Sequence, residues 1–426
     1  MQTAFTDRQL ADPQTAASHA EIRKCVHCGF CTATCPTYVL LGDERDSPRG
    51  RIELIKAMLE DGGSPQKSTV THIDRCLSCL ACVSACPSGV DYAQLIEQGR
   101  THIEAHFHRP LAQRIFRSLL GAVLPRPDRL GVALALGRLA RPLEPLLKSL
   151  KLSGLAALLR LVPAPVCAPD PQTHYPAEGC VRGRVALLKG CVEPAMSPTI
   201  RAAAIRLITR AGFDVELVEG EVCCGALSEH LGRADEAQAF AIANVKAWAQ
   251  AGPFDFIVTT AAGCGTSLKA YGHRLNGTPE AIGAAQSSRD ILEFIAEVGL
   301  PAVVRPAGLS VAYHAPCSLQ HGQKLAAGLA NLLVEAGFEV RPIAEGHLCC
   351  GSAGVYNILQ PQLAGRLRDR KAAHIMRTRA QVVAAGNVGC IAQLSPAIDI
   401  PILHPVELLD WATGGPKPHG LPQMGA

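Results

Sequence analysis

Residues 25–36 read Cys25-Val-His-Cys28-Gly-Phe-Cys31-Thr-Ala-Thr-Cys35-Pro36, which is the cysteine spacing C-x2-C-x2-C-x3-C-P. The same spacing returns at residues 76–87 as Cys76-Leu-Ser-Cys79-Leu-Ala-Cys82-Val-Ser-Ala-Cys86-Pro87. Three closely spaced thiolates can reach three irons of one cubic cluster, while the fourth cysteine leaves the loop. In proteins with two such loops, the fourth cysteine ligates the cluster of the other loop. The spacing therefore predicts two [4Fe–4S] clusters.

The two predicted ligand sets exchange their fourth cysteine. We expect the first cluster on Cys25, Cys28, Cys31 and Cys86, and the second on Cys76, Cys79, Cys82 and Cys35. Structural zinc is the alternative, because zinc sites also use C-x-x-C pairs. A tetrahedral zinc ion does not need a run of three cysteines with an outlying fourth, so the spacing favours iron–sulfur clusters.

The composition limits the class of protein. A chain of 426 residues suggests about three domains, and an apolar content of 48% is enough for buried cores. Residues 1–24 contain no apolar run resembling a secretion signal. The 18 cysteines are therefore better explained as metal ligands in a reducing compartment than as disulfides.

Charge and hydropathy restrict the partners. The net charge of +4 is too small to indicate nucleic acid, and we expect no such partner. No window approaches the ~20 apolar residues needed to span a bilayer. We predict a cytoplasmic protein. A peripheral position on the inner face of the cell membrane, reached directly or through a partner, stays open.

The motifs divide the chain into six expected segments. These are a flexible arm at 1–20, a helical two-cluster domain at 21–100, a basic helical linker at 101–178, two lobes at 179–300 and 301–413, and a disordered tail at 414–426. Between the cluster loops, residues 52–59 carry apolar side chains at helical spacing. Arg49 and Arg51, just before them, either offset the charge of the clusters or are solvated.

The linker is strongly basic. From Arg109 to Arg160 it carries ten Arg or Lys against two acids, Asp128 and Glu144, and prolines divide it into short helices. Such a stretch can lie on an anionic membrane or dock an acidic partner. We favour the simpler interpretation, a helical connector packed on the neighbouring domain.

An internal repeat follows the linker. Cys191, Cys223-Cys224-Gly225 and Cys264 recur as Cys317, Cys349-Cys350-Gly351 and Cys390, and each displacement is 126 residues. Such a fixed displacement indicates two duplicated lobes. Cys167 and Cys180 lie outside the repeat and are expected to be free thiols.

Each lobe alternates predicted strands with predicted helices. In the first lobe, strands are expected at 185–188, 215–218 and 256–259, with helices at 198–211 and 234–250. This alternation predicts a parallel α/β sheet covered on both faces. The fold class is therefore multidomain, with a helical ferredoxin-like domain, a helical linker and two α/β lobes. The cysteines follow the strands, at the sheet edge where ligands bind in such folds.

The eight repeated cysteines form two further candidate metal sites. Four thiolates per lobe suit either an iron–sulfur cluster or a zinc ion, and both alternatives stay open. The second lobe also carries His314, His321 and His347, whereas Leu188 and Glu221 occupy the positions of His314 and His347 in the first. We interpret these histidines as hydrogen-bond donors and not as ligands, because that is the commoner role beside a cluster.

At this point the chain resembles a known family, the iron–sulfur subunits of bacterial glycolate oxidases, which combine two ferredoxin motifs with duplicated Cys-Cys-Gly (CCG) domains. The resemblance rests on these stretches: Cys25-Val-His-Cys-Gly-Phe-Cys-Thr-Ala-Thr-Cys-Pro-Thr-Tyr38, Gly42-Asp-Glu44, Pro48-Arg-Gly-Arg51, Thr260-Ala-Ala-Gly-Cys-Gly265 and His347-Leu-Cys-Cys-Gly-Ser-Ala-Gly354. It implies flavin-binding partner subunits that oxidise glycolate to glyoxylate, and a quinone or membrane electron acceptor.

Two other families are similar, the first in its module order and the second in its CCG domains. One is the corresponding subunit of anaerobic glycerol-3-phosphate dehydrogenase, and lactate is a further substrate to consider for the partner. The other is the heterodisulfide reductases, whose CCG domains end in C-x-x-C. Ala261 and Asn387 stand at the first position of that pair here, which argues against a cluster needing a fifth thiolate.

We expect no flavin or nicotinamide cofactor in this chain. It has no G-x-G-x-x-G at the start of a strand–helix unit and no nucleotide-binding or nucleophile motif. Oxidation of an alcohol needs a hydride acceptor. The chain is therefore predicted to be an electron-transfer subunit of a 2-hydroxy-acid dehydrogenase, without catalytic residues of its own. The competing hypothesis is an enzyme with catalysis at the CCG lobes.

Overall fold

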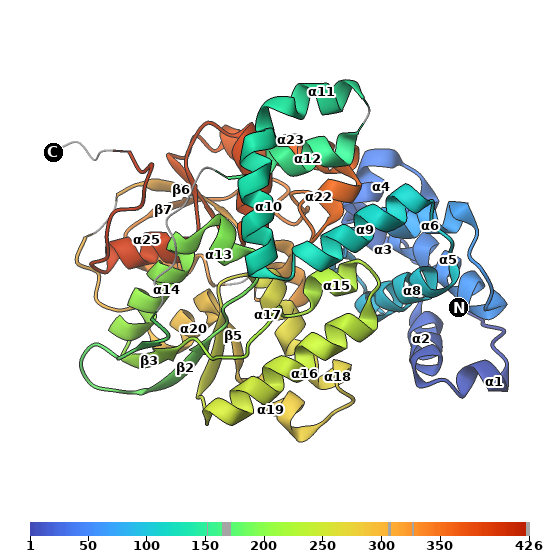
Figure 1. Cartoon of the computed structure of the whole chain (residues 1–426), viewed down its shortest axis with the longest axis horizontal. Helices are drawn as coiled ribbons and strands as arrows, with labels where there is room; N and C mark the ends of the chain where they lie inside the picture. Colours follow the sequence, from blue (N-terminus) through green and yellow to red (C-terminus); the bar gives the residue numbers. More distant parts are fainter. Residues whose placement is uncertain (151, 164–171, 306–307, 326–327, 423–426) are drawn as a thin grey trace.

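A computed structural model describes residues 1–150, 152–163, 172–305, 308–325 and 328–422. The chain forms a helical amino-terminal domain, a helical connector and two α/β lobes with parallel sheets (Figure 1). The predicted fold class is confirmed.

The amino-terminal domain is built from helices around one apolar core. Its longer helices are α2 (Pro13–Lys24), α5 (Pro48–Asp61), α6 (Lys67–Asp74) and α8 (Tyr92–His106). The core contains the fully buried side chains of Ile22, Ile55, Ile73 and Leu95, one from each helix. The two cysteine loops lie between these helices, and their short helices are α3 (Phe30–Ala33), α4 (Pro36–Leu41) and α7 (Ala81–Ser84). The core thus fixes the two loops relative to each other.

Residues 1–20, for which the sequence predicts a flexible arm, are largely helical in the structure. They form α1 (Asp7–Leu10) and most of α2, whose amino end is capped by the Asp12 carboxylate. The terminal ammonium of Met1 donates a hydrogen bond of 2.8 Å to the carbonyl of Cys25. The polar composition was misleading because Ser18 and Ile22 are fully buried against other helices, and local sequence does not encode that burial.

The first lobe has a five-stranded sheet in the order β1-β3-β2-β4-β5. The strands are β1 (His174–Tyr175), β2 (Gly183–Leu187), β3 (Phe213–Glu216), β4 (Phe256–Thr259) and β5 (Ser288–Asp290), and only β1 runs antiparallel to its neighbour. Alternate residues of β2 face opposite sides. Val185 packs with α14 (Pro198–Arg210) and α20 (Ile291–Val298), whereas Ala186 packs with α16 (Ala234–Ala251) and α17 (Ala262–Lys269).

The second lobe repeats this topology with four parallel strands in the order β7-β6-β8-β9. The strands are β6 (Ser310–His314), β7 (Glu339–Arg341), β8 (Val382–Ala385) and β9 (Ile402–Leu403), and the principal helices are α21 (Asn331–Glu335), α23 (Pro361–Arg377), α24 (Val388–Leu394) and α25 (Pro405–Ala412). The strand order matches that of β3-β2-β4-β5, as a duplication requires.

The two lobes share one hydrophobic core. Helix α14 of the first lobe packs against α25 of the second, and the core continues from Phe294 to Leu409 and Trp411. The buried carboxylate of Asp410 pairs with Arg206 and Arg210 from the other lobe. Figure 1 shows α14 and α25 side by side, at the end of the molecule away from the blue amino-terminal helices. The lobes therefore have a fixed relative position.

The connector consists of α9 (Leu111–Val123), α10 (Pro127–Ala140), α11 (Glu144–Ser149) and α12 (Ser153–Arg160). One face of α9 packs on both lobes, where Leu120 contacts Leu231 and Val355. Arg117 donates a hydrogen bond of 2.9 Å to the carbonyl of Leu231. This is the packed connector that the sequence favoured. No helix in the described ranges has both the length and the hydropathy to cross a membrane.

Two smaller expectations concern the connector's end and the tail. Cys167 lies outside the described residues, and Cys180 is an exposed free thiol. Of the tail expected at 414–426, the structure describes residues 414–422, and Leu421 in this part is buried in the shared core.

Candidate metal centres

The first cysteine loop surrounds a small cavity. Cys25, Cys28, Cys31 and Cys86 all line it, together with Cys82. The side chain of Cys28 is exposed, and Cys31 is half-buried. Burial raises the pKa of the Cys31 thiol to about 11. Four thiols around one cavity are a donor set that fits a cubic cluster, and one side of that cavity is open to the surface.

The second set of thiols is buried. Cys76, Cys79 and Cys82 from the second loop, and Cys35 from the first, are each at most 9% exposed. Burial raises the pKa of Cys82 well above its usual value, and the neighbouring thiols of Cys79, Cys76 and Cys35 raise it further. Cys35 therefore lies within electrostatic reach of the second loop. These four thiols also suit a cluster, here in a dry environment.

The two loops have the same unusual backbone. In the first, His27 and Gly29 have positive φ angles of 56° and 86°, and in the second Ser78 and Leu80 have 51° and 60°. These residues stand at matching positions after the first cysteine of each motif. The left-handed turns curl the loop so that backbone N–H groups face its thiols, and the amide of Ser78 lies 3.4 Å from the Sγ of Cys76. Leu80 adopts a conformation that normally favours glycine.

Two buried arginines stabilise the second set of thiols. Arg51 is 1% exposed and donates from Nη1 to the Sγ of Cys35, at 3.8 Å. Arg100 donates to the carbonyl of Cys76 at 2.6 Å. Although burial opposes it, Arg51 and Arg100 lower the pKa of the Cys76 thiol below its usual value. Arg51 thus acts on the thiols of the second set, whereas Arg49 is bound to Glu44 near the surface.

The CCG cysteines gather at the carboxyl ends of the strands. In the first lobe the Sγ atoms of Cys191 and Cys223 are 3.5 Å apart, and Cys224 contacts Cys264. In the second lobe the Sγ separations are 3.8 Å for Cys317 and Cys349, and 3.4 Å for Cys350 and Cys390. Each lobe therefore brings its four repeated cysteines together, as two adjacent pairs.

A glycine is needed beside each cysteine pair. Gly225 and Gly351 have φ angles of +93° and +92°. A Cβ atom on Gly225 would lie 3.0 Å from the carbonyl oxygen of Ala237, and one on Gly351 would lie 2.6 Å from that of Ala364. Both the φ angle and the close helix exclude a side chain, so the CCG triplet is a conformational requirement.

The two sets of CCG cysteines face one cavity of about 170 Å³ between the lobes. Cys191, Cys224 and Cys264 line it from the first lobe, and all four cysteines of the second lobe line it from the other side. Leu77 and Ser78 of the second cluster loop also reach this cavity. The repeat in the sequence does not indicate that both lobes contribute to a single space.

The second cluster loop packs on the second lobe. Leu77 and Cys79 are in one apolar cluster with Cys349 and Tyr356, and Cys317 packs against that cluster. Ser84 in the same loop lies 3.0 Å from Nδ1 of His321. The predicted second cluster is therefore adjacent to the thiols of lobe two.

The three histidines of the second lobe differ in environment. His347 is exposed, and His321 contacts Ser84 and the carbonyl of His347. His314 is 3% exposed, and neither of its ring nitrogens has a hydrogen-bond partner among the described residues. One nitrogen of His314 and the Sγ atoms of Cys350 and Cys390 all lie within 4.8 Å of one another. The hydrogen-bonding role expected for His314 has no support in these contacts.

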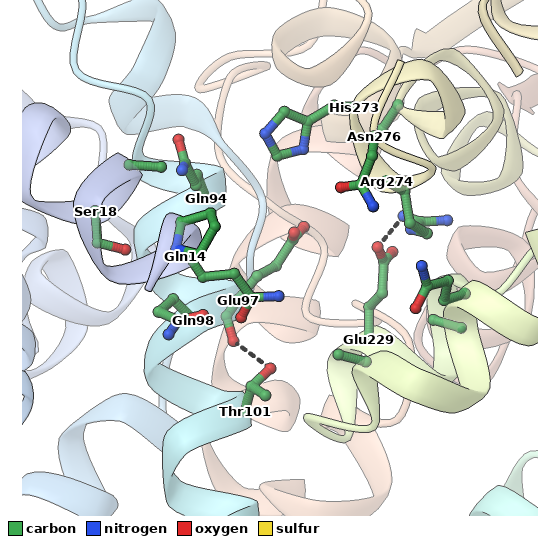
Figure 2. A pocket seen from close by; sticks show the side chains of 16 residues that line it. Gln14, Ser18, Gln94, Glu97, Gln98, Thr101, Glu229, His273, Arg274 and Asn276 are labelled. Carbon is green, nitrogen blue, oxygen red and sulfur yellow. Dashed lines mark hydrogen bonds and ion pairs between the residues drawn. The ribbon is translucent and has the colours of Figure 1, made fainter. Parts of the chain in front are cut away.

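A larger polar cleft lies elsewhere, between the amino-terminal domain and the first lobe (Figure 2). It has a volume of about 440 Å³ and no cysteine in its lining. Glu229 and Arg274 form an ion pair on one wall, and Thr101 donates to the carbonyl of Glu97 on the other. These groups satisfy one another, so we assign no chemistry to this cleft.

Family models match both parts of the chain. Residues 24–90 match a 4Fe-4S dicluster domain, and residues 185–269 and 311–395 each match a cysteine-rich domain. The glycolate oxidase iron-sulfur subunit of Escherichia coli is 38% identical over 97% of this chain and 99% of its own length. This chain belongs to the family of glycolate oxidase iron–sulfur subunits. The predictions of family, iron–sulfur cofactors and an electron-transfer role in an oxidoreductase complex are thereby confirmed.

Two further relatives differ in how much of the chain they share. A probable glycolate oxidase iron-sulfur subunit of Bacillus subtilis is 31% identical over 89% of both chains. A component of the fumarate reductase (CoM/CoB) of Methanothermobacter marburgensis is 28% identical, but over only 54% of this chain and 46% of its own length. The full module order is thus shared with the glycolate oxidase relatives.

Several functional residues were not found from the sequence. Arg100 and Tyr92 contact Cys76 from α8, and Tyr92 places its hydroxyl 3.7 Å from the Cys76 Sγ. No motif marks these residues. Lys371 on α23 is 2% exposed and also lies within electrostatic reach of Cys350. The sequence did contain one signal for Lys371, because it is a charged residue on the apolar face of α23.

Proposed function

We propose that this chain carries electrons from a flavin-binding partner that oxidises glycolate to glyoxylate. The single observation that carries the proposal is the apolar cluster that Cys79 shares with Cys349 and against which Cys317 packs, because this cluster joins the ferredoxin domain to the second CCG lobe. The proposed cluster ligands are Cys25, Cys28, Cys31 and Cys86 for the first cluster, and Cys76, Cys79, Cys82 and Cys35 for the second. The named activity of the E. coli and B. subtilis relatives supports glycolate as the substrate.

The arrangement gives the electron path a direction. Val26 and Phe30 are 68% and 65% exposed beside the first loop, where Cys28 is also exposed. Exposed apolar side chains around an accessible cluster suit docking of the flavin-binding subunit. The second loop is buried against lobe two. We infer that electrons enter at the first cluster and leave toward the CCG lobes.

The clusters, when bound, supply one-electron redox chemistry. The chain's own residues keep that chemistry dry and balance its charge. Arg51 and Arg100 compensate the thiolates of the second set, and the Tyr92 hydroxyl lies against Cys76. Burial and N–H groups aimed at sulfur are the features that set cluster potentials.

Reconstitution tests this function. The anaerobically purified chain should contain at least about eight irons and should not oxidise glycolate alone with an artificial acceptor. Addition of its flavin-binding partner should give glycolate-dependent reduction of the clusters, followed by their visible absorbance. Lactate and glycerol 3-phosphate serve as competing substrates. Turnover of glycolate by the isolated chain, or an iron-free protein, would refute the proposal.

We also propose that the acceptor is a membrane quinone and that the chain lies on the inner face of the membrane. Three apolar side chains on α10, Val132, Leu136 and Leu139, are 63%, 62% and 80% exposed and recur at helical spacing. Exposed Arg129 and Arg141 flank this apolar stripe. An apolar stripe with basic neighbours complements an anionic lipid surface.

Vesicle flotation tests this surface. The full chain should bind phosphatidylglycerol-containing vesicles and not pure phosphatidylcholine. The double variant Leu136→Gln/Leu139→Gln should lose most of that binding. Ile242→Gln, on α16 of the first lobe and 52% exposed, is the matched control and should bind normally. Equal binding by all three proteins would remove this surface from consideration.

A further inference from the structure

We propose that His314 ligates an iron of an iron–sulfur cluster in the second lobe, together with the CCG thiols of that lobe. The first lobe has no equivalent ligand, because Leu188 occupies the corresponding position. The inference rests on the proposed electron path, and it names the residue that makes the two lobes chemically different.

The position of His314 is fixed by the sheet. It is the last residue of β6 and pairs with Ala385 at the end of β8, just before the segment that carries Cys390. Residues paired across neighbouring strands place their side chains on the same face of the sheet, and Ala385 is in one apolar cluster with Cys350 and Cys390. A histidine here therefore reaches the thiols without any loop movement.

The distances suit shared coordination. A ring nitrogen of His314 and the Sγ atoms of Cys350 and Cys390 lie within 4.8 Å of one another, and all three residues are buried. In an iron–sulfur cluster each iron takes its own protein ligand, so an imidazole and two thiolates that converge on one buried point can each bind a different iron of one cluster.

The missing partners of the ring support a ligand role. His314 is 3% exposed, and no described residue hydrogen-bonds to either nitrogen. A buried polar group without a partner is destabilising. By contrast, the buried His404 uses its Nδ1 to accept a hydrogen bond from the amide of Val406 at the start of α25. The imidazole of His314 has no such hydrogen bond among the described residues.

A buried cation indicates negative charge at the same place. The Nζ of Lys371, which is 2% exposed, donates to the carbonyl of Glu345 at 2.6 Å. The thiols of Cys350, Cys349 and Cys390 and the carboxylate of Glu345 all lie within its electrostatic reach. A buried ammonium needs a compensating anion. Ligated thiolates provide one, so Lys371 supports metal binding at this lobe.

Ligation by histidine has a redox consequence. Replacing thiolate ligands by imidazole raises the reduction potential of an iron–sulfur centre. The lobe-two centre would then accept an electron from the second cluster. The second cluster is oxidised as the lobe-two centre is reduced, and no bond or proton changes. The apolar cluster that Cys79 shares with Cys349 puts this acceptor next to its donor.

Spectroscopy of the full chain tests the ligand. Wild type labelled with 15N-histidine should show a nitrogen hyperfine coupling on a lobe-two signal in pulsed EPR. His314→Leu should lose that coupling and either lose iron or lower the potential of this centre. His347→Leu, an exposed histidine two residues before the same cysteine pair, is the matched control and should retain the coupling.

A third variant separates ligation from hydrogen bonding. His314→Gln can still donate a hydrogen bond to a cluster sulfur but is a poor iron ligand, so it should resemble His314→Leu. Wild-type behaviour of His314→Gln, absence of the nitrogen coupling from the wild type, or zinc in place of iron would each overturn the proposal. The ferredoxin cluster signals report separately on the proposed electron path, because they should persist in every variant.

Discussion

The Nη1 atom of Arg51 lies 3.8 Å from the Sγ of Cys35, in a place where both side chains are buried. The same guanidinium donates to Asp46 at 3.2 Å and to the Thr37 hydroxyl at 3.0 Å. Asp46 is fully buried and also contacts Arg75. This network ties the helix between the cluster loops to the cysteine that leaves the first loop.

Replacement of Arg51 by methionine should destabilise the protein by about 3–5 kcal/mol, because Asp46 would lose one partner in a buried ion pair. The second cluster should also be lost more readily to a chelator. The midpoint of urea unfolding and the rate of iron release measure these effects. Arg49→Met is the control, since Arg49 pairs with Glu44 near the surface and should cost less than about 1 kcal/mol.

Double cysteine variants should reveal how the two ligand sets are divided. If Cys28 and Cys86 share a cluster, Cys28→Ser/Cys86→Ser should lose about four irons, no more than either single variant. Cys28→Ser/Cys35→Ser should lose about eight, because it damages both clusters. Iron analysis after anaerobic purification gives the counts. The reverse pattern would mean that each loop holds its own cluster with its own fourth cysteine.

The Glu193 carboxyl should make stability depend on pH. Burial raises its pKa to about 7, despite the hydrogen bond from the Thr260 hydroxyl. The folded state then binds this proton more tightly than the unfolded state, so stability falls as pH rises from about 4.5 to about 7. Glu193→Gln lacks the titrating carboxyl. The stability of the variant minus that of the wild type should therefore be larger at pH 8 than at pH 4.5, by up to about 3 kcal/mol.

Urea unfolding of the wild type and of Glu193→Gln across this pH range measures the difference between their stabilities. The contributions of the other titrating groups cancel in this difference. Glu219→Gln, an exposed carboxylate in the same lobe, is the control and should leave the pH profile unchanged. A Glu193→Gln variant whose stability differs from wild type by the same amount at every pH would contradict the argument.

Gly351→Ala should destabilise the second lobe by about 1–3 kcal/mol. The substitution combines a φ of +92° with a Cβ only 2.6 Å from the carbonyl oxygen of Ala364, which is backbone and cannot move aside alone. Gly365→Ala, in the open middle of α23, is the control and should stabilise by about 0.5–1 kcal/mol. Thermal unfolding distinguishes the two. A similar gain for both variants would show that the CCG turn tolerates a side chain.

The sequence alone determined the kind of centre and the number of lobes. Cysteine spacing encodes a cluster loop, because ligands of one cluster must be close in the chain or follow a fixed pattern. The constant displacement of 126 residues encodes a duplicated α/β lobe, because a shared strand order requires a shared spacing. Both signals are local or periodic, so they are readable without coordinates.

Only the tertiary structure decided how these parts meet. The apolar cluster that holds Cys79 and Cys349, the cavity shared by the two lobes and the isolation of the His314 ring among the described residues all depend on residues far apart in the chain. The burial of Arg51 and of Ser18 depends in the same way on helices packed from elsewhere. Such contacts follow from how whole elements bury their apolar faces against one another, and no local pattern records that choice.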